Sequence, residues 1–189
     1  IPAMSFFVAA DAYDRFMGRY SDPLAPPFAD FAEVSLGQRV LDVGSGPGAL
    51  TAELVARLGP EAVSAVDPSE PFVAALRERH PDVDVQLAPA EDLPFASGTF
   101  DAALAQLVVH FMKDPLAGLR EVARVTRPSG IVAACVWDHS RGGQGPLSLF
   151  WEAVRDVGHA AADESSLTGT REGQLAEFFT TAGLRDVED

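Results

Sequence analysis

A short apolar strand followed by alternate glycines constrains this chain more than any other sequence feature. Residues 39–43 (RVLDV) are predicted to form the strand, and Gly44, Gly46 and Gly48 follow before an amphipathic segment that begins at Ala49. Glycines let a backbone turn sharply and approach a ligand closely, and the free N–H groups at the following helix start face that ligand. The pattern predicts a ligand-binding turn between a strand and a helix, although a glycine-rich turn without a ligand has the same spacing.

The rest of the chain alternates short apolar segments with longer amphipathic ones, as in a parallel sheet covered by helices. We expect strands over residues 39–43, 63–66, 83–87, 100–109 and 131–137, a turn at 127–130, and the start of a sixth strand at 184–187. We expect helices over residues 49–58, 70–79, 114–126, 147–162 and 173–181. This order predicts an α/β fold with a doubly wound, mostly parallel sheet and helices on both faces.

An acidic residue supports a ligand at the glycine turn. Asp67 ends the second expected strand, 19 residues after Gly48. In a doubly wound sheet a carboxylate at this position lies across the crevice from the glycine turn and can accept both hydroxyls of a ribose. The alternative is a solvated helix N-cap, because the segment that follows Asp67 is expected to start a helix.

The glycine spacing separates two cofactor classes. Dinucleotide-binding turns carry G-x-G-x-x-G, because a pyrophosphate rests on the helix N-terminus. Here Gly48 comes one residue too early for that pattern. Asp42, just before the turn, would repel a pyrophosphate but could pair with an ammonium group. Both details favour S-adenosylmethionine over NAD.

Composition excludes several other classes. The formal net charge of −14 disfavours binding to a phosphate backbone, so we expect no nucleic-acid partner. Cys135 is the only cysteine, and no cysteine and histidine cluster has metal-ligand spacing, so we expect neither a disulfide nor a metal site. The longest apolar runs are far shorter than a membrane span and no signal peptide is evident, so we expect a cytoplasmic protein without membrane segments.

Six short motifs occur in order between Tyr13 and Asp138. They are residues 13–19 (YDRFMGR), the glycine turn at 40–48, and residues 66–69 (VDPS), 90–95 (AEDLPF), 100–101 (FD) and 121–128 (EVARVTRP). In this order and at these spacings, the set resembles the class I S-adenosylmethionine-dependent methyltransferases. The resemblance is greatest to the group that includes the ubiquinone and menaquinone biosynthesis enzymes, and it implies a Rossmann-like fold.

The resemblance implies a role for each residue of a predicted cofactor site. The glycine turn would line the methionine portion of the cofactor, Asp42 would face its ammonium, Gln106 would lie under it, and Arg19 would reach its carboxylate. Asp67 would hold the ribose, Pro68 and Ser69 would flank the adenine, and the segment from Ala90 would meet the adenine edge. The predicted set is Arg19, Asp42, Gly44, Ser45, Gly46, Gly48, Asp67, Pro68, Ser69, Ala90, Glu91 and Gln106.

Two positions depart from the pattern of these relatives. Pro89 stands where they often have an aspartate that accepts a hydrogen bond from the adenine amino group. Adenine recognition then falls to Glu91 or is weaker. Ser129 stands where they often have glycine, which looks tolerable.

The resemblance also implies one domain over residues 1–189. Residues 1–35 would form an N-terminal helical lid, 36–138 the cofactor-binding core, and 139–189 a substrate-side, C-terminal segment. The sheet of the family has seven strands, whereas this chain reaches Asp189 early in the sixth. We expect an incomplete set of C-terminal strands, and either a shortened chain or a homodimer that covers the open sheet edge.

The acceptor side is less specific. Methyl transfer from a sulfonium proceeds by proximity and alignment, and a general base is needed only if the acceptor must lose a proton. His110, after the fourth expected strand, is the candidate base, although a packed histidine has the same pattern. His139 is a weaker candidate. Phe150 and Trp151 would form either a wall of the substrate pocket or part of the core. The aromatic residues near the N-terminus would form either a lid over the cofactor or a helix packed on the sheet.

These observations predict methyl transfer to a small-molecule acceptor. Two alternatives stay open. One is a protein that binds the nucleoside without catalysis, and the other, less favoured by the glycine spacing, is an NAD-dependent oxidoreductase.

Overall fold

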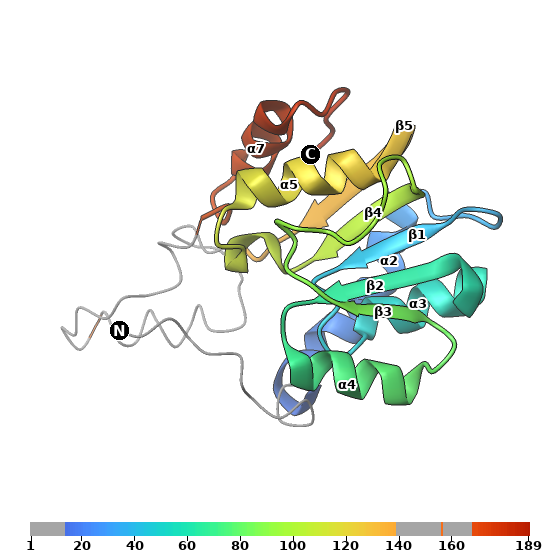
Figure 1. Cartoon of the computed structure of the whole chain (residues 1–189). Helices are drawn as coiled ribbons and strands as arrows, with labels where there is room; N and C mark the ends of the chain where they lie inside the picture. Colours follow the sequence, from blue (N-terminus) through green and yellow to red (C-terminus); the bar gives the residue numbers. More distant parts are fainter. Residues whose placement is uncertain (1–13, 139–155, 157–167) are drawn as a thin grey trace.

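The computed structural model describes residues 14–138, 156 and 168–189 (Figure 1). Its strands are β1 (Val40–Val43), β2 (Val63–Asp67), β3 (Asp84–Leu87), β4 (Phe100–Gln106) and β5 (Thr126–Cys135). Its helices are α2 (Arg19–Phe31), α3 (Ala49–Leu58), α4 (Glu70–Arg79), α5 (Pro115–Val125) and α7 (Gln174–Ala182), with short turns η1 (Asp14–Gly18), η2 (Pro60–Ala62) and η3 (Val109–Phe111).

The five strands form one parallel sheet in the order β3-β2-β1-β4-β5. The chain builds outward from β1 to β3 and then returns to place β4 on the other side of β1. This reversal opens a crevice at the carboxyl ends of β1 and β4, which is where ligands bind in sheets of this class. The predicted doubly wound α/β fold is therefore confirmed.

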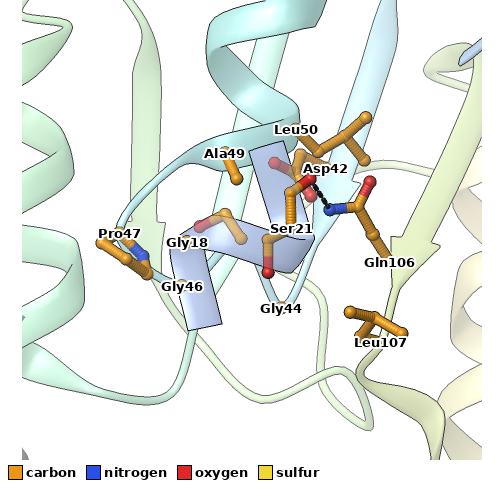
Figure 2. Close-up of a pocket in the computed structure, with 11 residues that line it drawn as sticks. Gly18, Ser21, Asp42, Gly44, Gly46, Pro47, Ala49, Leu50, Gln106 and Leu107 are labelled. Carbon is orange, nitrogen blue, oxygen red and sulfur yellow. Dashed lines mark hydrogen bonds between the residues drawn. The ribbon is translucent and has the colours of Figure 1, made fainter. Parts of the chain in front are cut away.

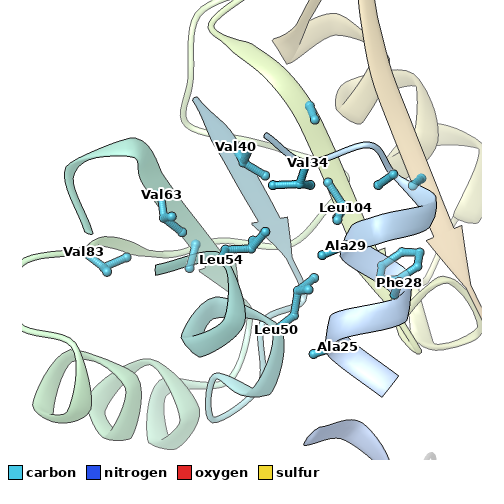
Figure 3. Close-up of a cluster of buried hydrophobic side chains, with 14 of the residues drawn as sticks. Ala25, Phe28, Ala29, Val34, Val40, Leu50, Leu54, Val63, Val83 and Leu104 are labelled. Carbon is cyan, nitrogen blue, oxygen red and sulfur yellow. The ribbon is translucent and has the colours of Figure 1, made fainter. Parts of the chain in front are cut away.

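Helices cover both faces of the sheet (Figure 1). Side chains of β1 alternate between two cores, with Val40 in one and Leu41 in the other. The first core packs against α2, α3 and α4 and includes Leu50 and Leu54 (Figure 3). The second packs against α5 and α7 and includes Leu119. Because both faces are covered, β1 and β2 are buried along their whole length, which explains their mainly apolar sequence.

Helix α2 packs as part of the first core. Ala25, Phe28 and Ala29 are buried in it, and Arg57 of α3 donates to the carboxylate of Asp30 and to the carbonyl oxygen of Pro26. The second half of α2 is thus fixed to α3. This agrees with the alternative in which the N-terminal segment is a helix packed on the sheet. The aromatic residues expected nearer the N-terminus, Phe6, Phe7 and Tyr13, lie outside the described residues.

Three expectations about the strands and turns are wrong. The fourth strand ends at Gln106 and not at 109, because Leu107 has a φ of 60° and turns the chain into η3. The turn expected at 127–130 lies inside β5. The pairing of β5 with β4 shifts in register there, between Phe100 and Ala102 of β4, and Ser129 has a φ of 64°. The sixth strand expected at 184–187 is not formed, and Asp186 with a φ of 52° interrupts an extended course.

The C-terminal helix agrees with expectation. Helix α7 ends at Ala182, and Gly183 caps it with a φ of 96°. The helix expected over 147–162, with Phe150 and Trp151, lies almost entirely outside the described residues, as does His139. Within residues 14–138 and 168–189, no helix has the length and apolar character to cross a membrane.

Candidate functional site

The loop after β1 crosses the carboxyl ends of β1 and β2. Gly44, Gly46 and Gly48 have φ angles of 70°, 54° and 108°, which side chains rarely tolerate. The N–H groups of Gly44 and Ser45 donate to the carbonyl oxygen of Val66 at 2.8 and 3.0 Å. A Cβ atom on Gly44 would lie 2.2 Å from Cγ2 of Val108. Glycine is needed here because the loop is packed between two strand ends.

The carboxylate of Asp67 ties this loop to the start of α4. Oδ2 of Asp67 accepts from the N–H of Gly46 at 2.8 Å, and Oδ1 accepts from the N–H of Ser69 at 2.8 Å. The side chain is buried, and burial raises the pKa of Asp67 against the opposite effect of these two N–H groups. Asp67 is therefore not the solvated N-cap of the alternative interpretation, since the N-cap position belongs to Ser69.

Asp42 is the second buried carboxylate at the crevice. Oγ1 of Thr51, one turn into α3, donates to its Oδ2 at 2.6 Å. The pKa of Asp42 is raised to about 7, chiefly by burial and in smaller part by the negative charge of Asp67, while the hydrogen bonds from Thr51 oppose the rise. An opposite charge brought next to Asp42 would restore the ionised form. The side chain can thus exchange a proton for a cationic ligand group.

A hollow of about 40 Å³ lies between this loop and the first turn of α2 (Figure 2). Nε2 of Gln106, the last residue of β4, donates to the carbonyl oxygen of Ser21 at 3.1 Å and closes one side. The lining residues are Gly18, Ser21, Asp42, Gly44, Ser45, Gly46, Pro47, Ala49, Leu50, Gln106 and Leu107.

Two buried polar atoms of this hollow have no hydrogen-bond partner among the residues that the structure describes. They are Oγ of Ser45 and Oε1 of Gln106. Buried polar atoms are nearly always hydrogen-bonded, so unpartnered ones at a hollow indicate a place for a polar ligand. Together with the carboxylate of Asp42, they suit a ligand that carries both donors and a positive charge.

The segment expected at the adenine begins beside Asp67. The N–H of Ala88 donates to the carbonyl oxygen of Asp67 at 3.1 Å, and Ala90 is buried two residues later. Oε1 of Glu91 accepts from the N–H of Asp114 at 3.0 Å, so this carboxylate is directed to the start of α5. Pro68, at the opposite side of the crevice, is exposed.

Comparison with known proteins decides the family. Residues 41–134 match the methyltransferase domain family. The chain is 36% identical over 186 residues to an uncharacterised methyltransferase of Mycobacterium tuberculosis. The aligned region covers 98% of this chain and 70% of that relative. The chain belongs to the class I S-adenosylmethionine-dependent methyltransferases.

Further comparisons agree with this assignment. This chain is 33% identical over 153 residues to the chloroplastic 2-methyl-6-phytyl-1,4-hydroquinone methyltransferase 2 of rice. The aligned region covers 79% of this chain and 40% of that relative. A solved methyltransferase in complex with the Haloferax volcanii Trm112 activator superposes with a TM-score of 0.76 at 23% identity, over 95% of this chain and 76% of that chain. The structural match supports the fold.

Of the predicted site residues of the methyltransferase, Asp42, Gly44, Ser45, Gly46 and Gln106 line the hollow, and Arg19 and His110 are among those that do not. Nη2 of Arg19 donates to the carbonyl oxygen of Arg15, and its guanidinium lies 5.9 Å from the ring centre of Phe16. His110 is buried in η3, with its ring centre 4.0 Å from that of Phe111. The roles expected for Arg19 and His110 therefore stay predictions.

Several residues of the hollow or its support were not predicted from the sequence, among them Gly18, Ser21 and Thr51. Gly18 and Ser21 reach it only because α2 packs across the sheet, and no local pattern announces that approach. Thr51 carried a usable signal, since it lies one helical turn after the glycine loop in a segment that is otherwise apolar on that face. Within residues 14–138 and 168–189, no group of three metal-ligating side chains is found.

Proposed function

We propose that this methyltransferase binds S-adenosylmethionine across the carboxyl ends of β1 and β2 and transfers its methyl group to a small-molecule acceptor by in-line displacement. One observation supports this most: two buried carboxylates, Asp42 and Asp67, flank a glycine loop whose hollow also holds two unpartnered polar atoms. The donor and acceptor chemistry of these residues fits the cofactor. When bound, the cofactor supplies a methyl group activated by a positively charged sulfur.

On this proposal each carboxylate has a separate task. Asp67 accepts the ribose hydroxyls at the end of β2, while the N–H groups of Gly46 and Ser69 fix its orientation. Asp42 gives up its proton and pairs with the cofactor ammonium, and Thr51 holds its second oxygen in place. Gln106 and Ser45 use their unpartnered oxygens on the same amino-acid portion.

Entry of a nucleoside needs more space than the hollow offers. Sites for small ligands usually occupy roughly 300 to 1,000 Å³, whereas this hollow is about 40 Å³. We expect the first turn of α2 to shift outward, which breaks the hydrogen bond from Gln106 to Ser21. Such a movement is consistent with a lid role for the start of this helix, while its second half stays fixed by Arg57.

The acceptor is a small molecule, and the relatives suggest where to begin. The rice relative is named for a hydroquinone, and the net charge of −14 disfavours a nucleic-acid acceptor. We propose phenolic and hydroquinone compounds as the first acceptors to test. A phenolic oxygen must lose a proton on methylation, and His110, after β4, is the proposed base.

Transfer of labelled methyl groups from S-adenosylmethionine to a panel of hydroquinones and phenols tests this function. We expect turnover that depends on the acceptor, and a loss of turnover in His110→Gln without loss of cofactor affinity. Binding of the cofactor with no turnover on any acceptor would favour the alternative of a binding-only protein. The departure at Pro89 is a sequence feature that keeps this alternative open.

We also propose that a second copy of the chain covers the outer edge of β5. Within the sheet that the described residues form, β5 pairs only with β4, which leaves its other edge open. Open strand edges favour pairing with another chain. Sedimentation at micromolar concentration should show a dimer, and a stable monomer would contradict this proposal.

A further inference from the structure

The loop over residues 88–98 joins β3 to the turn before β4 and is held by hydrogen bonds from outside itself. At the start of the loop, the N–H of Ala88 donates to the main-chain carbonyl oxygen of Asp67, so the loop begins beside the residue proposed for the ribose. A loop with no ladder partners depends on side chains or water to satisfy its polar backbone groups. In this loop, two side chains of α5 supply several of these bonds.

Arg124 of α5 bonds to the middle of the loop. Its Nη1 donates to the carbonyl oxygen of Phe95 at 2.8 Å, and its Nη2 donates to that of Leu93 at 3.0 Å. Its own carbonyl oxygen accepts from the N–H of Gly98 at 2.9 Å. One residue of α5 therefore fixes three points of the loop.

Glu121, one helical turn earlier, completes the arrangement. Its Oε2 accepts from the N–H of Leu93 at 3.1 Å, and its Oε1 accepts from Nε of Arg124 at 2.6 Å. Both backbone polar groups of the buried residue Leu93 are thus bonded to this pair. The pair lowers the pKa of Glu121, so its carboxylate stays ionised at neutral pH.

The first part of the loop is tied to the same helix. Oε1 of Glu91 accepts from the N–H of Asp114, the residue that caps α5 through its bond from Ala117. Helix α5 and its N-cap therefore hold the loop near both ends of the loop, and Ala90 lies between β3 and the first of these hydrogen bonds, that of Glu91. The motif that contains Glu121 and Arg124 was part of the resemblance but had no role assigned to it.

We propose that Arg124, held by Glu121, is a positioning residue for the adenine of the cofactor: it fixes the loop over residues 88–98 in the conformation that presents its backbone to the base. This inference rests on the proposed function, because the placement of adenine at this loop belongs to it. Arg124 does not touch the cofactor and acts through the loop. A planar guanidinium can bond two carbonyl oxygens at once, which an ammonium cannot do as well.

Titration calorimetry with two ligands tests the proposal. The ligands are S-adenosylhomocysteine and S-inosylhomocysteine, in which a carbonyl replaces the adenine amino group. The wild type should prefer the adenine form. In Arg124→Met the affinity for S-adenosylhomocysteine should fall by about tenfold, and the preference between the two bases should shrink. Arg124→Lys should lie between the wild type and Arg124→Met, and because it keeps the charge it serves as the better-folded variant.

Arg57→Met is a matched control. Arg57 also pairs with a glutamate one turn earlier, Glu53, and also donates to a backbone carbonyl, that of Pro26, but it lies on α3 away from the loop. This variant should lower the melting temperature and leave the base preference unchanged. Hydrogen exchange of residues 91–96 in the ligand-free protein should be faster in Arg124→Met and unchanged in Arg57→Met.

The outcomes separate the two proposals. Wild-type affinity, base preference and hydrogen exchange in Arg124→Met would overturn the positioning role. So would an equal loss of affinity for both ligands, because general loosening of the fold changes both alike. A wild type that binds neither ligand would instead overturn the proposed function, and this inference with it.

Discussion

The carboxylate of Asp67 accepts a hydrogen bond from the N–H of Gly46 at 2.8 Å, which joins the end of β2 to the glycine loop after β1. Its other oxygen accepts from the N–H of Ser69 at the start of α4. One buried side chain thus holds both walls of the crevice in a fixed relation. A ligand that bonds to this carboxylate meets a site whose two sides are already aligned, which reduces the ordering cost of binding.

Asp67→Asn should lower both the stability of the fold and the affinity for the cofactor. An asparagine side chain has one acceptor oxygen and can satisfy either the Gly46 or the Ser69 N–H, but not both. We expect a loss of about 1–2 kcal/mol in the free energy of unfolding and at least about tenfold weaker binding of S-adenosylhomocysteine. Urea unfolding and calorimetry measure the two effects. Asp82→Asn, at an exposed acidic position, should change neither.

Asp42 should make cofactor affinity depend on pH. Burial raises the pKa of Asp42 to about 7 in the free protein, whereas an ammonium partner requires its ionised form. Affinity should therefore fall as the pH drops below about 7, by up to about tenfold per pH unit. Calorimetry in buffers of different ionisation enthalpy should detect proton release on binding at pH 6. Affinity that stays constant between pH 6 and 8 would contradict this role.

The same carboxyl group should lower stability as the pH rises. The folded chain binds the Asp42 proton more tightly than the unfolded chain, whose pKa is near 3.8. Its stabilising effect is thus complete below about pH 4 and is lost as the pH rises through about 7. Asp42→Asn lacks this loss, so the stability of the variant relative to the wild type should be greater at pH 8 than at pH 5. Denaturant unfolding of both proteins at pH 5 and pH 8 provides the comparison.

Thr51→Val should move the pH profile without removing the carboxylate. The Thr51 hydroxyl donates to Asp42 and lowers its pKa, so its loss should raise that pKa above the wild-type value. The pH at which cofactor affinity is half lost should shift upward. An unchanged midpoint would mean that Thr51 does not tune Asp42. Thr180→Val is a suitable control, because its hydroxyl bonds only within α7 to Ala176.

Two glycines of the loop should respond differently to alanine. Gly44→Ala places a Cβ 2.2 Å from Val108 at a φ of 70°, and overpacking of this kind costs about 1–3 kcal/mol. Gly46→Ala meets no atom within 4 Å and should cost only about 1–2 kcal/mol from its φ of 54°. Since Gly46 lines the hollow, its variant should fold but bind S-adenosylhomocysteine more weakly. Val108→Ala should partly restore the melting temperature of Gly44→Ala.

Much of the fold could be predicted because its determinants are local. The buried strands are short, mainly apolar runs, and the spacing of the glycines and of Asp67 marks the loop and the carboxylate. The end of β4 could not be predicted, since Leu107 adopts a left-handed conformation in an apolar run that reads as more strand. The approach of Ser21 to Gln106 joins residues 85 positions apart, and only the packing of α2 on the sheet brings them together.

The most direct test is calorimetric titration of the purified chain with S-adenosylmethionine, S-adenosylhomocysteine and NADH. We predict binding of the first two at about micromolar dissociation constants, its loss in Asp67→Ala, and no binding of NADH. Binding of NADH without binding of S-adenosylmethionine would contradict the assignment of the crevice at the carboxyl end of the sheet to a sulfonium nucleoside.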